Sequence, residues 1–240
     1  MADLQVAERL DQVREQITAA CARAGRPEGS VRLVAVSKRI ALPLVVAAFE
    51  AGQRDFGENR VLDVLNRQPE LSAALSGRGH DPSLIAWHFI GHIQSNKSAK
   101  VAGRFSLLHG VDSLELAERI SRRCLALNCT QPILLEVNIA QEVQKSGLAP
   151  ALVGDVAAQV AALPGLALTG LMGMARRGDS PQQLGRTFAQ LRLLAEAARQ
   201  ASGLPLPELS MGMSNDFPIA IAEGATTVRV GSAIFGPRSA

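Results

Sequence analysis

The chain's first apolar run reads Val31-Arg32-Leu33-Val34-Ala35-Val36-Ser37-Lys38. Its aliphatic and β-branched side chains, together with its length, predict a buried strand over residues 33–37. The run stops at Lys38, so an amine stands where the carboxyl end of this strand meets the surface.

A helix is expected before this strand. Apolar residues recur at helical spacing from Val6 to Ala20, and Gly25 followed by Arg26-Pro27 is typical of a helix end. We therefore expect a leading helix from about residue 4 to residue 24.

After the first strand, the chain alternates between short β-rich runs and longer amphipathic runs. Eight strands are expected, at residues 33–37, 55–57, 86–90, 106–111, 133–139, 166–172, 208–211 and 226–230. Helices are expected between them, at residues 42–51, 60–75, 95–101, 113–126, 149–163, 181–201 and 217–222. Two helix starts are marked, one by Asp112 with Glu115 as a capping box and one by Ser180 before Pro181.

Eight βα units in 240 residues predict an α/β fold, a (β/α)8 barrel of the TIM type with an additional N-terminal helix. We expect a single domain over residues 1–240. The alternative is an open dinucleotide-binding sheet, which needs a glycine fingerprint after the first strand. Lys38-Arg39-Ile40-Ala41 occupies that place, so the closed barrel is favoured.

Composition excludes several classes of function. The formal charge of +3 is spread along the chain without a basic stripe interleaved with aromatic residues, which argues against a nucleic-acid partner. No apolar run is long enough to cross a membrane and no signal peptide is recognisable, so we expect a cytoplasmic protein, and a monomer. Three cysteines without zinc-ligand spacing predict reduced, buried thiols and no metal site.

The loops after the last two strands are candidates for binding a phosphate. In an α/β barrel the functional face lies at the carboxyl ends of the strands, and phosphate often binds after strands seven and eight. Here these loops are Ser210-Met211-Gly212-Met213-Ser214-Asn215-Asp216 and Arg229-Val230-Gly231-Ser232. Glycine lets the backbone approach an anion, and serine donates to it. Taken singly, each loop is more often an ordinary turn with a capping serine, but their joint position after the last two strands favours a ligand site.

Lys38 is expected at the same rim as these loops. A partly desolvated lysine there forms a Schiff base readily, and an amine beside a phosphate site indicates pyridoxal phosphate. The alternative is a surface lysine whose stem packs on apolar neighbours.

Other strand ends add polar groups to the expected rim: Glu58 and Asn59 after the second strand, His88 and His92 around the third, Asn138 after the fifth and Lys145 beyond it. The two histidines are separated by Gly91 and a strand end, so they do not form a helical metal pair. We expect them to act as hydrogen-bonding groups.

Several motifs occur in order along the chain: Ala35-Val36-Ser37-Lys38, Phe56-Gly57-Glu58-Asn59, Trp87-His88-Phe89-Ile90-Gly91, Gln94-Ser95-Asn96-Lys97, Lys145-Ser146-Gly147, Gly170-Leu171-Met172, Ser210-Met211-Gly212-Met213-Ser214 and Val228-Arg229-Val230-Gly231. Together, from about Val31 to Gly236, they resemble the pyridoxal phosphate homeostasis protein family. That family is similar to the barrel domain of bacterial alanine racemase.

The resemblance implies a role for six residues. Lys38 would carry pyridoxal 5'-phosphate as a Schiff base, and Arg229 would face the pyridine nitrogen. Ser214, Gly231 and Ser232 would hold the phosphate, and Asn59 would lie against the cofactor. Two departures concern the entrance of the site: His92 replaces the family's usual proline, and residues 140–144 replace its usual serine-containing loop.

Three functions remain open from the sequence. The favoured one is a non-catalytic pyridoxal phosphate binding protein that buffers the cofactor or delivers it to apo-enzymes, as the resemblance implies. Alanine racemase needs a tyrosine from an additional domain as a second base, and this chain has no tyrosine and ends at Ala240. The alternatives are a weak amino-acid racemase that uses His88, His92 or a partner subunit, and a phosphate-ester enzyme in which Lys38 acts only through its charge.

Overall fold

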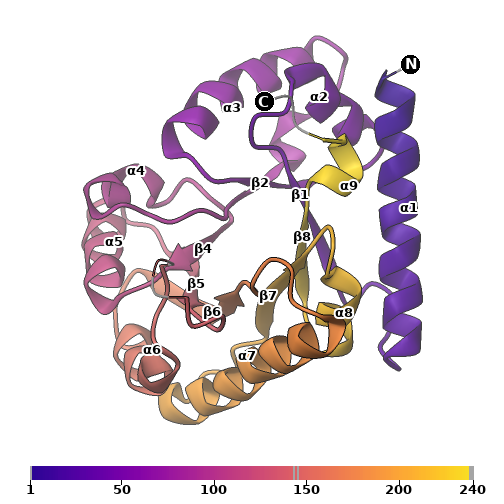
Figure 1. Cartoon of the computed structure of the whole chain (residues 1–240). Helices are drawn as coiled ribbons and strands as arrows, with labels where there is room; N and C mark the ends of the chain where they lie inside the picture. Colours follow the sequence, from indigo (N-terminus) through magenta and orange to yellow (C-terminus); the bar gives the residue numbers. More distant parts are fainter. Residues whose placement is uncertain (1, 143, 145, 238–240) are drawn as a thin grey trace.

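The computed structural model describes residues 2–142, 144 and 146–237. Within them eight parallel strands close into a barrel in the order β1 to β8, with β8 hydrogen-bonded back to β1 (Figure 1). The strands are β1 (Arg32–Val36), β2 (Asp55–Glu58), β3 (Ala86–Phe89), β4 (Leu107–Val111), β5 (Gln131–Val137), β6 (Leu166–Gly173), β7 (Glu208–Met213) and β8 (Thr227–Val230). The expected TIM-type barrel is confirmed.

Helices surround the barrel. They are α1 (Ala2–Arg23), α2 (Leu42–Glu50), α3 (Val61–Ser76), α4 (Ser98–Val101), α5 (Leu114–Ala126), α6 (Val153–Ala161), α7 (Pro181–Ser202), α8 (Phe217–Ala222) and α9 (Ser232–Phe235). Short 3-10 turns lie at Pro82–Leu84, Ser95–Lys97 and Pro150–Leu152. No helix in the described part of the chain is long and apolar enough to cross a membrane.

The leading helix α1 lies outside the ring and packs against α2, α8 and α9 (Figure 1). Val6, Leu10 and Val13 repeat at helical spacing and are buried, which gives α1 the apolar stripe that docks it. The expected N-terminal helix is therefore confirmed and lies next to the seam where β8 meets β1.

The strand and helix boundaries differ from the expected ones by a few residues. β5 begins at Gln131 rather than at residue 133. Pro132 lacks an N–H, but its position in the strand pairing does not need one, and the side chain of Gln131 donates hydrogen bonds to the carbonyls of Phe105 and Pro132. The helix expected at 95–101 is a 3-10 turn followed by one turn of α4. The short helix α9 was not expected from the sequence.

One of the two expected helix caps is wrong. α5 is capped by Ser113, whose Oγ accepts from the backbone N–H of Leu116 at 3.3 Å. Asp112 instead pairs with His92, at 2.9 Å between Oδ2 and Nδ1. The Ser180 cap of α7 is confirmed, and Gln183 completes a capping box with it.

The core consists of the inner side chains of the barrel and the layer between barrel and helices. Phe89, Phe217 and Phe235 are buried there. Cys21 and Cys124 are buried, whereas Cys129 is half-buried, which corrects the expectation of three buried thiols.

Candidate functional site

Lys38 follows β1 at the carboxyl-terminal rim of the barrel. The backbone N–H of Ser37 donates to the carbonyl of Gly57 at 3.0 Å, so the β1–β2 pairing extends to the residue before the lysine. Ser37 is fully buried and Lys38 is half-buried. The lysine therefore leaves the barrel wall at the rim, as its position in the sequence predicts.

A buried carboxyl group lies beside Lys38. Ser37 Oγ donates to Glu58 Oε1 at 2.8 Å, and Arg67 Nε is 3.7 Å from the same oxygen. Burial raises the pKa of Glu58, and the Ser37 hydrogen bond, Arg67 and Lys38 oppose that rise. The positive charge of Lys38 therefore acts on Glu58, so the amine and this carboxyl group belong to one electrostatic cluster.

Ser214 brings the loops after β7 and β8 together. Its Oγ lies 3.2 Å from the backbone N of Gly231 and 3.4 Å from that of Ala233, and it accepts from both. Ser232, the first residue of α9, is exposed beside them. Two backbone N–H groups thus converge on one oxygen atom at the rim, which is the arrangement that an anion requires.

The seam of the barrel brings this cradle near Lys38. β1 and β8 are paired with Val34 opposite Arg229 and Ala35 opposite Val230. Because parallel strands advance together, the residues that follow each strand reach the same stretch of rim. Lys38 and Gly231 are therefore neighbours in the fold, although 193 positions separate them in the sequence.

Arg229 points into the barrel and is 4% exposed. Its Nη1 donates to Ser210 Oγ at 2.6 Å, and its Nη2 donates to the carbonyl of Gly173 at 3.2 Å. Burial lowers the pKa of Arg229 to about 10, and the carboxyl groups of Glu136 and Asp216 oppose that shift. The guanidinium therefore stays charged at neutral pH and is held close to the carboxyl end of β6.

Glu136 lies near this guanidinium with an unsatisfied oxygen. Its Oε1 accepts from Ser146 Oγ at 3.1 Å, while its buried Oε2 has no hydrogen-bond partner among the residues that the structure describes. Burial raises the pKa of Glu136, and Asp112 adds to that rise. A buried polar atom without a partner is costly, so the barrel mouth offers an acceptor or, when protonated, a donor to a bound group.

Asn59 borders an open cleft of about 500 Å³ between the loops after β2 and β3. His92 and Lys97 line the same cleft, and His92 is exposed. The backbone of Asn59 touches Gly91 so closely that a Cβ on Gly91 would lie 2.4 Å from the Asn59 carbonyl. The two loops are thus held together at the entrance.

Two other expected rim groups have local roles or lie elsewhere. Asn138 does follow β5, but its side-chain amide donates to the backbone carbonyl of Glu142 and accepts from the backbone N–H of Glu142. These two hydrogen bonds close the loop that begins at Asn138. Lys145 lies outside the described residues.

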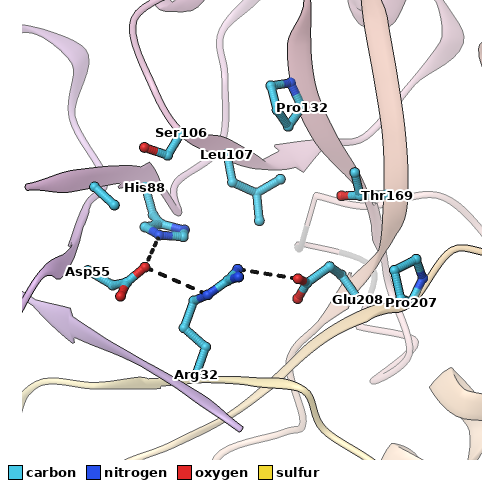
Figure 2. Close-up of a pocket in the computed structure, with 10 residues that line it drawn as sticks. Arg32, Asp55, His88, Ser106, Leu107, Pro132, Thr169, Pro207 and Glu208 are labelled. Atoms are coloured by element: carbon cyan, nitrogen blue, oxygen red, sulfur yellow. Dashed lines mark hydrogen bonds and ion pairs between the residues drawn. The ribbon is translucent and has the colours of Figure 1, made fainter. Parts of the chain in front are cut away.

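His88 is not at the rim, and its expected position there is wrong. It lies inside the barrel, 2% exposed, and faces a pocket of about 290 Å³ at the amino-terminal mouth (Figure 2). Figure 2 shows its Nε2 directed at Asp55 Oδ1, 2.9 Å away, with Arg32 bridging Asp55 and Glu208. His88 is the third residue of β3 and points inward because side chains alternate along a strand. From there its ring reaches the pocket at the amino-terminal mouth.

Several polar residues in and around the barrel were given no individual role from the sequence: Ser37, Arg67, His109, Glu136, Ser210 and Asp216. A signal was present for some of them, since a charged or polar residue inside an apolar run, such as Glu136 or His109, indicates an inward position in a barrel. Among the described residues no three His, Cys, Asp or Glu side chains are placed to hold a metal ion.

Comparison with known proteins agrees with this geometry. Residues 9–239 match the family model of the alanine racemase N-terminal domain. A pyridoxal phosphate homeostasis protein of Escherichia coli K12 is 40% identical over 239 residues, which covers 97% of both chains. The chain belongs to the pyridoxal phosphate homeostasis protein family.

Other relatives in this family give the same picture. A pyridoxal phosphate homeostasis protein of Aquifex aeolicus is 36% identical over 98% of this chain and 99% of its own. The solved structure of PipY from Synechococcus elongatus with PLP bound superposes with a TM-score of 0.83 at 37% identity, covering 96% of this chain and all of that one.

An alanine racemase of Clostridium difficile shares the fold. Its TM-score is 0.71 at 15% identity, and the superposition covers 98% of this chain but 57% of the racemase chain. The likeness to alanine racemase therefore concerns the barrel alone.

Proposed function

We propose that this chain binds pyridoxal 5'-phosphate at the carboxyl-terminal mouth of the barrel and acts in pyridoxal phosphate homeostasis without being an enzyme. The observation that carries the proposal is the β1–β8 seam, whose register puts Lys38 on the same stretch of rim as the convergent N–H groups of Gly231 and Ala233. Relatives that carry this name and the PLP-bound PipY structure support it.

The residues present fit this cofactor. The N–H groups now shared by Ser214 Oγ would turn to the phosphate, and Ser214 and Ser232 would add hydroxyl donors. The charged Arg229 would donate to the pyridine nitrogen, and Asn59 would lie against the ring. Bound there, the cofactor would supply an aldehyde, and Lys38 would supply the amine that holds it as a Schiff base.

A carrier is favoured over an amino-acid enzyme for two reasons. Arg229, charged and anchored to Ser210, would hold the pyridine nitrogen unprotonated, which weakens the ring as an electron sink. In addition, the sequence contains no tyrosine to act as a second base. Of the two histidines considered for that role, His88 faces the other mouth and only His92 lies at the entrance.

The first test is optical. Apo-protein mixed with pyridoxal phosphate should gain a visible absorption band that Lys38→Ala abolishes. Lys100, exposed on α4, provides the matched control, and Lys100→Ala should leave the band unchanged. A phosphate-ester enzyme would give no band with any variant, and a colourless wild-type protein would contradict the proposal.

The second test separates carrier from racemase. Loaded protein should restore activity to an apo-enzyme that needs pyridoxal phosphate, and it should leave the chirality and identity of each amino acid unchanged. Turnover that is lost in both Lys38→Ala and His92→Ala would overturn the carrier in favour of a weak racemase. Failure to reactivate any apo-enzyme would restrict the protein to buffering.

A further inference from the structure

An unbroken chain of hydrogen bonds crosses the barrel interior from Arg229 to the amino-terminal mouth. Arg229 Nη1 lies 2.6 Å from Ser210 Oγ, which lies 2.8 Å from His109 Nδ1. His109 Nε2 lies 3.0 Å from His88 Nδ1, and His88 Nε2 lies 2.9 Å from Asp55 Oδ1. Four strands besides β8 therefore contribute one member each.

With both imidazoles neutral, the two ends of the chain fix the direction of every hydrogen bond. A guanidinium can only donate, and an ionised carboxylate can only accept. His88 must therefore donate from Nε2 to Asp55, which leaves Nδ1 of a neutral His88 as an acceptor. His109 must then donate from Nε2, so its own Nδ1 accepts from the hydroxyl of Ser210, and that hydroxyl oxygen accepts from Arg229.

Burial keeps this direction in place. His109 is fully buried, and burial together with the nearby His88, Arg229 and Arg32 holds the pKa of His109 well below its usual range. A neutral imidazole carries one N–H, so only one tautomer satisfies both neighbours. If Arg229 rotated away, Ser210 Oγ would lose the donor at Nη1 and the Gly173 carbonyl would lose the donor at Nη2.

An apolar side chain could fill the position of His109 without needing any partner, since Leu107, Leu134 and Met172 already form a small apolar cluster inside the barrel. A buried polar chain stabilises a fold less than well-packed apolar residues do. The presence of these five polar residues is better explained by a role toward the Arg229 guanidinium, which lies at one end of the hydrogen-bonded chain below the carboxyl-terminal mouth.

We propose that Ser210, His109 and His88 are positioning residues, which orient the Arg229 guanidinium toward the ring nitrogen of the bound cofactor and use Asp55 as the terminal acceptor. The proposal rests on the proposed function, because it takes Arg229 to face that nitrogen. None of the three touches the cofactor, and they act through the orientation and charge of Arg229.

The first test uses the unsubstituted apo-protein and is independent of the cofactor. Nitrogen-15 NMR of histidine-labelled protein at neutral pH should show His88 and His109 as neutral rings protonated at Nε2. Ser210→Ala should change the His109 signals, because the Nδ1 partner is lost. A His109 protonated at Nδ1, or a charged imidazolium, would overturn the proposal.

The second test uses the loaded protein. Ser210→Ala should shift the visible band of the bound cofactor and weaken its binding by about five- to tenfold, the loss of one buried hydrogen bond. Ser210→Thr, which retains the hydroxyl, should restore both. Ser121→Ala is the matched control, because Ser121 is also buried and donates at 2.7 Å to the carbonyl of Pro164, away from this chain.

The outcomes separate the two proposals. If Ser210→Ala binds with the spectrum and affinity of Ser121→Ala, the positioning role is wrong and the proposed function stands. If wild-type protein gains no band, the proposed function is wrong and the role toward the cofactor fails with it, whereas the tautomer assignment is judged by NMR alone.

Discussion

Glu136 keeps one carboxylate oxygen inside the barrel without a hydrogen-bond partner in the described part of the chain. Burial raises its pKa above the ordinary value of 4.5, so the folded protein retains this proton to a higher pH than the unfolded chain does. The stability that Glu136 contributes is full below pH 4.5 and is lost as pH rises through the folded-state pKa.

We therefore expect the stability of the Glu136→Gln apo-protein to increase relative to that of the wild type as pH rises from 4 to 7. Glutamine is always neutral and carries no charge that must be buried. Thermal melts at several pH values measure the difference. Glu15→Gln, exposed on α1, is the control and should show no such trend. A difference that is flat or reversed in sign would refute the assignment of a raised pKa.

Glycines at the rim show how closely neighbouring backbones approach. A Cβ on Gly110 would lie 2.2 Å from the carbonyl oxygen of Gly91, whereas a Cβ on Gly154 in α6 would meet only Ala201 Cβ, at 3.7 Å. A glycine-to-alanine substitution should therefore lower the stability of the protein at Gly110 and raise it at Gly154.

Gly110→Ala should destabilise the protein by about 1 to 3 kcal/mol, because backbone must move to admit the methyl group. Gly154→Ala should stabilise it by about 0.5 to 1 kcal/mol, because alanine favours the helix. Chemical denaturation measures both. Equal effects of the two substitutions would show that the rim backbones can separate at little cost.

At the scale of elements, Arg26 ties the end of α1 to the last βα unit. Its Nη1 donates to the carbonyls of Ile221 at 3.0 Å and Ala225 at 2.7 Å, and its Nη2 donates to that of Ser30. The Ile221 carbonyl lies in the last turn of α8, so the guanidinium adds a side-chain cap to that helix end.

Arg26→Ala should lower stability by about 2 kcal/mol, which corresponds to a fall of roughly 4 to 8 °C in Tm for a chain of this size. The exposed Arg23, on the last turn of α1, is the control, and Arg23→Ala should change Tm little. Indistinguishable melting of the two variants would mean that solvent replaces these hydrogen bonds without cost.

Elements were easier to predict from the sequence than side-chain direction. The eight strands were found because strands buried on both faces read as short apolar runs, and Lys38 and Ser214 were placed because strand ends define the rim. His88 was misplaced for the same reason: a run that is apolar on both faces does not reveal which residues point inward. The α9 turn was missed because four residues carry no periodicity.

At the scale of the whole molecule, the proposed site lies where the first strand, β1, pairs with the last strand, β8. Ligand binding should therefore stabilise the closed barrel. Pyridoxal phosphate at about a hundred times its Kd should add about 2.7 kcal/mol. Pyridoxal, without the phosphate, should add much less at the same concentration. The Ser214→Ala and Ser232→Ala double variant should narrow that gap, which thermal shift titrations measure. Equal stabilisation by the two ligands would contradict a phosphate cradle at Gly231.

The β1–β8 seam also has a consequence for biosynthesis. Lys38 emerges from the ribosome 191 residues before Arg229, which at about 5–20 residues per second is a delay of roughly 10 to 40 s. During that interval the nascent chain has the amine but neither the proposed phosphate cradle nor the strand that closes the barrel. Binding of pyridoxal phosphate at the proposed site would therefore require the last strand to have been translated and inserted.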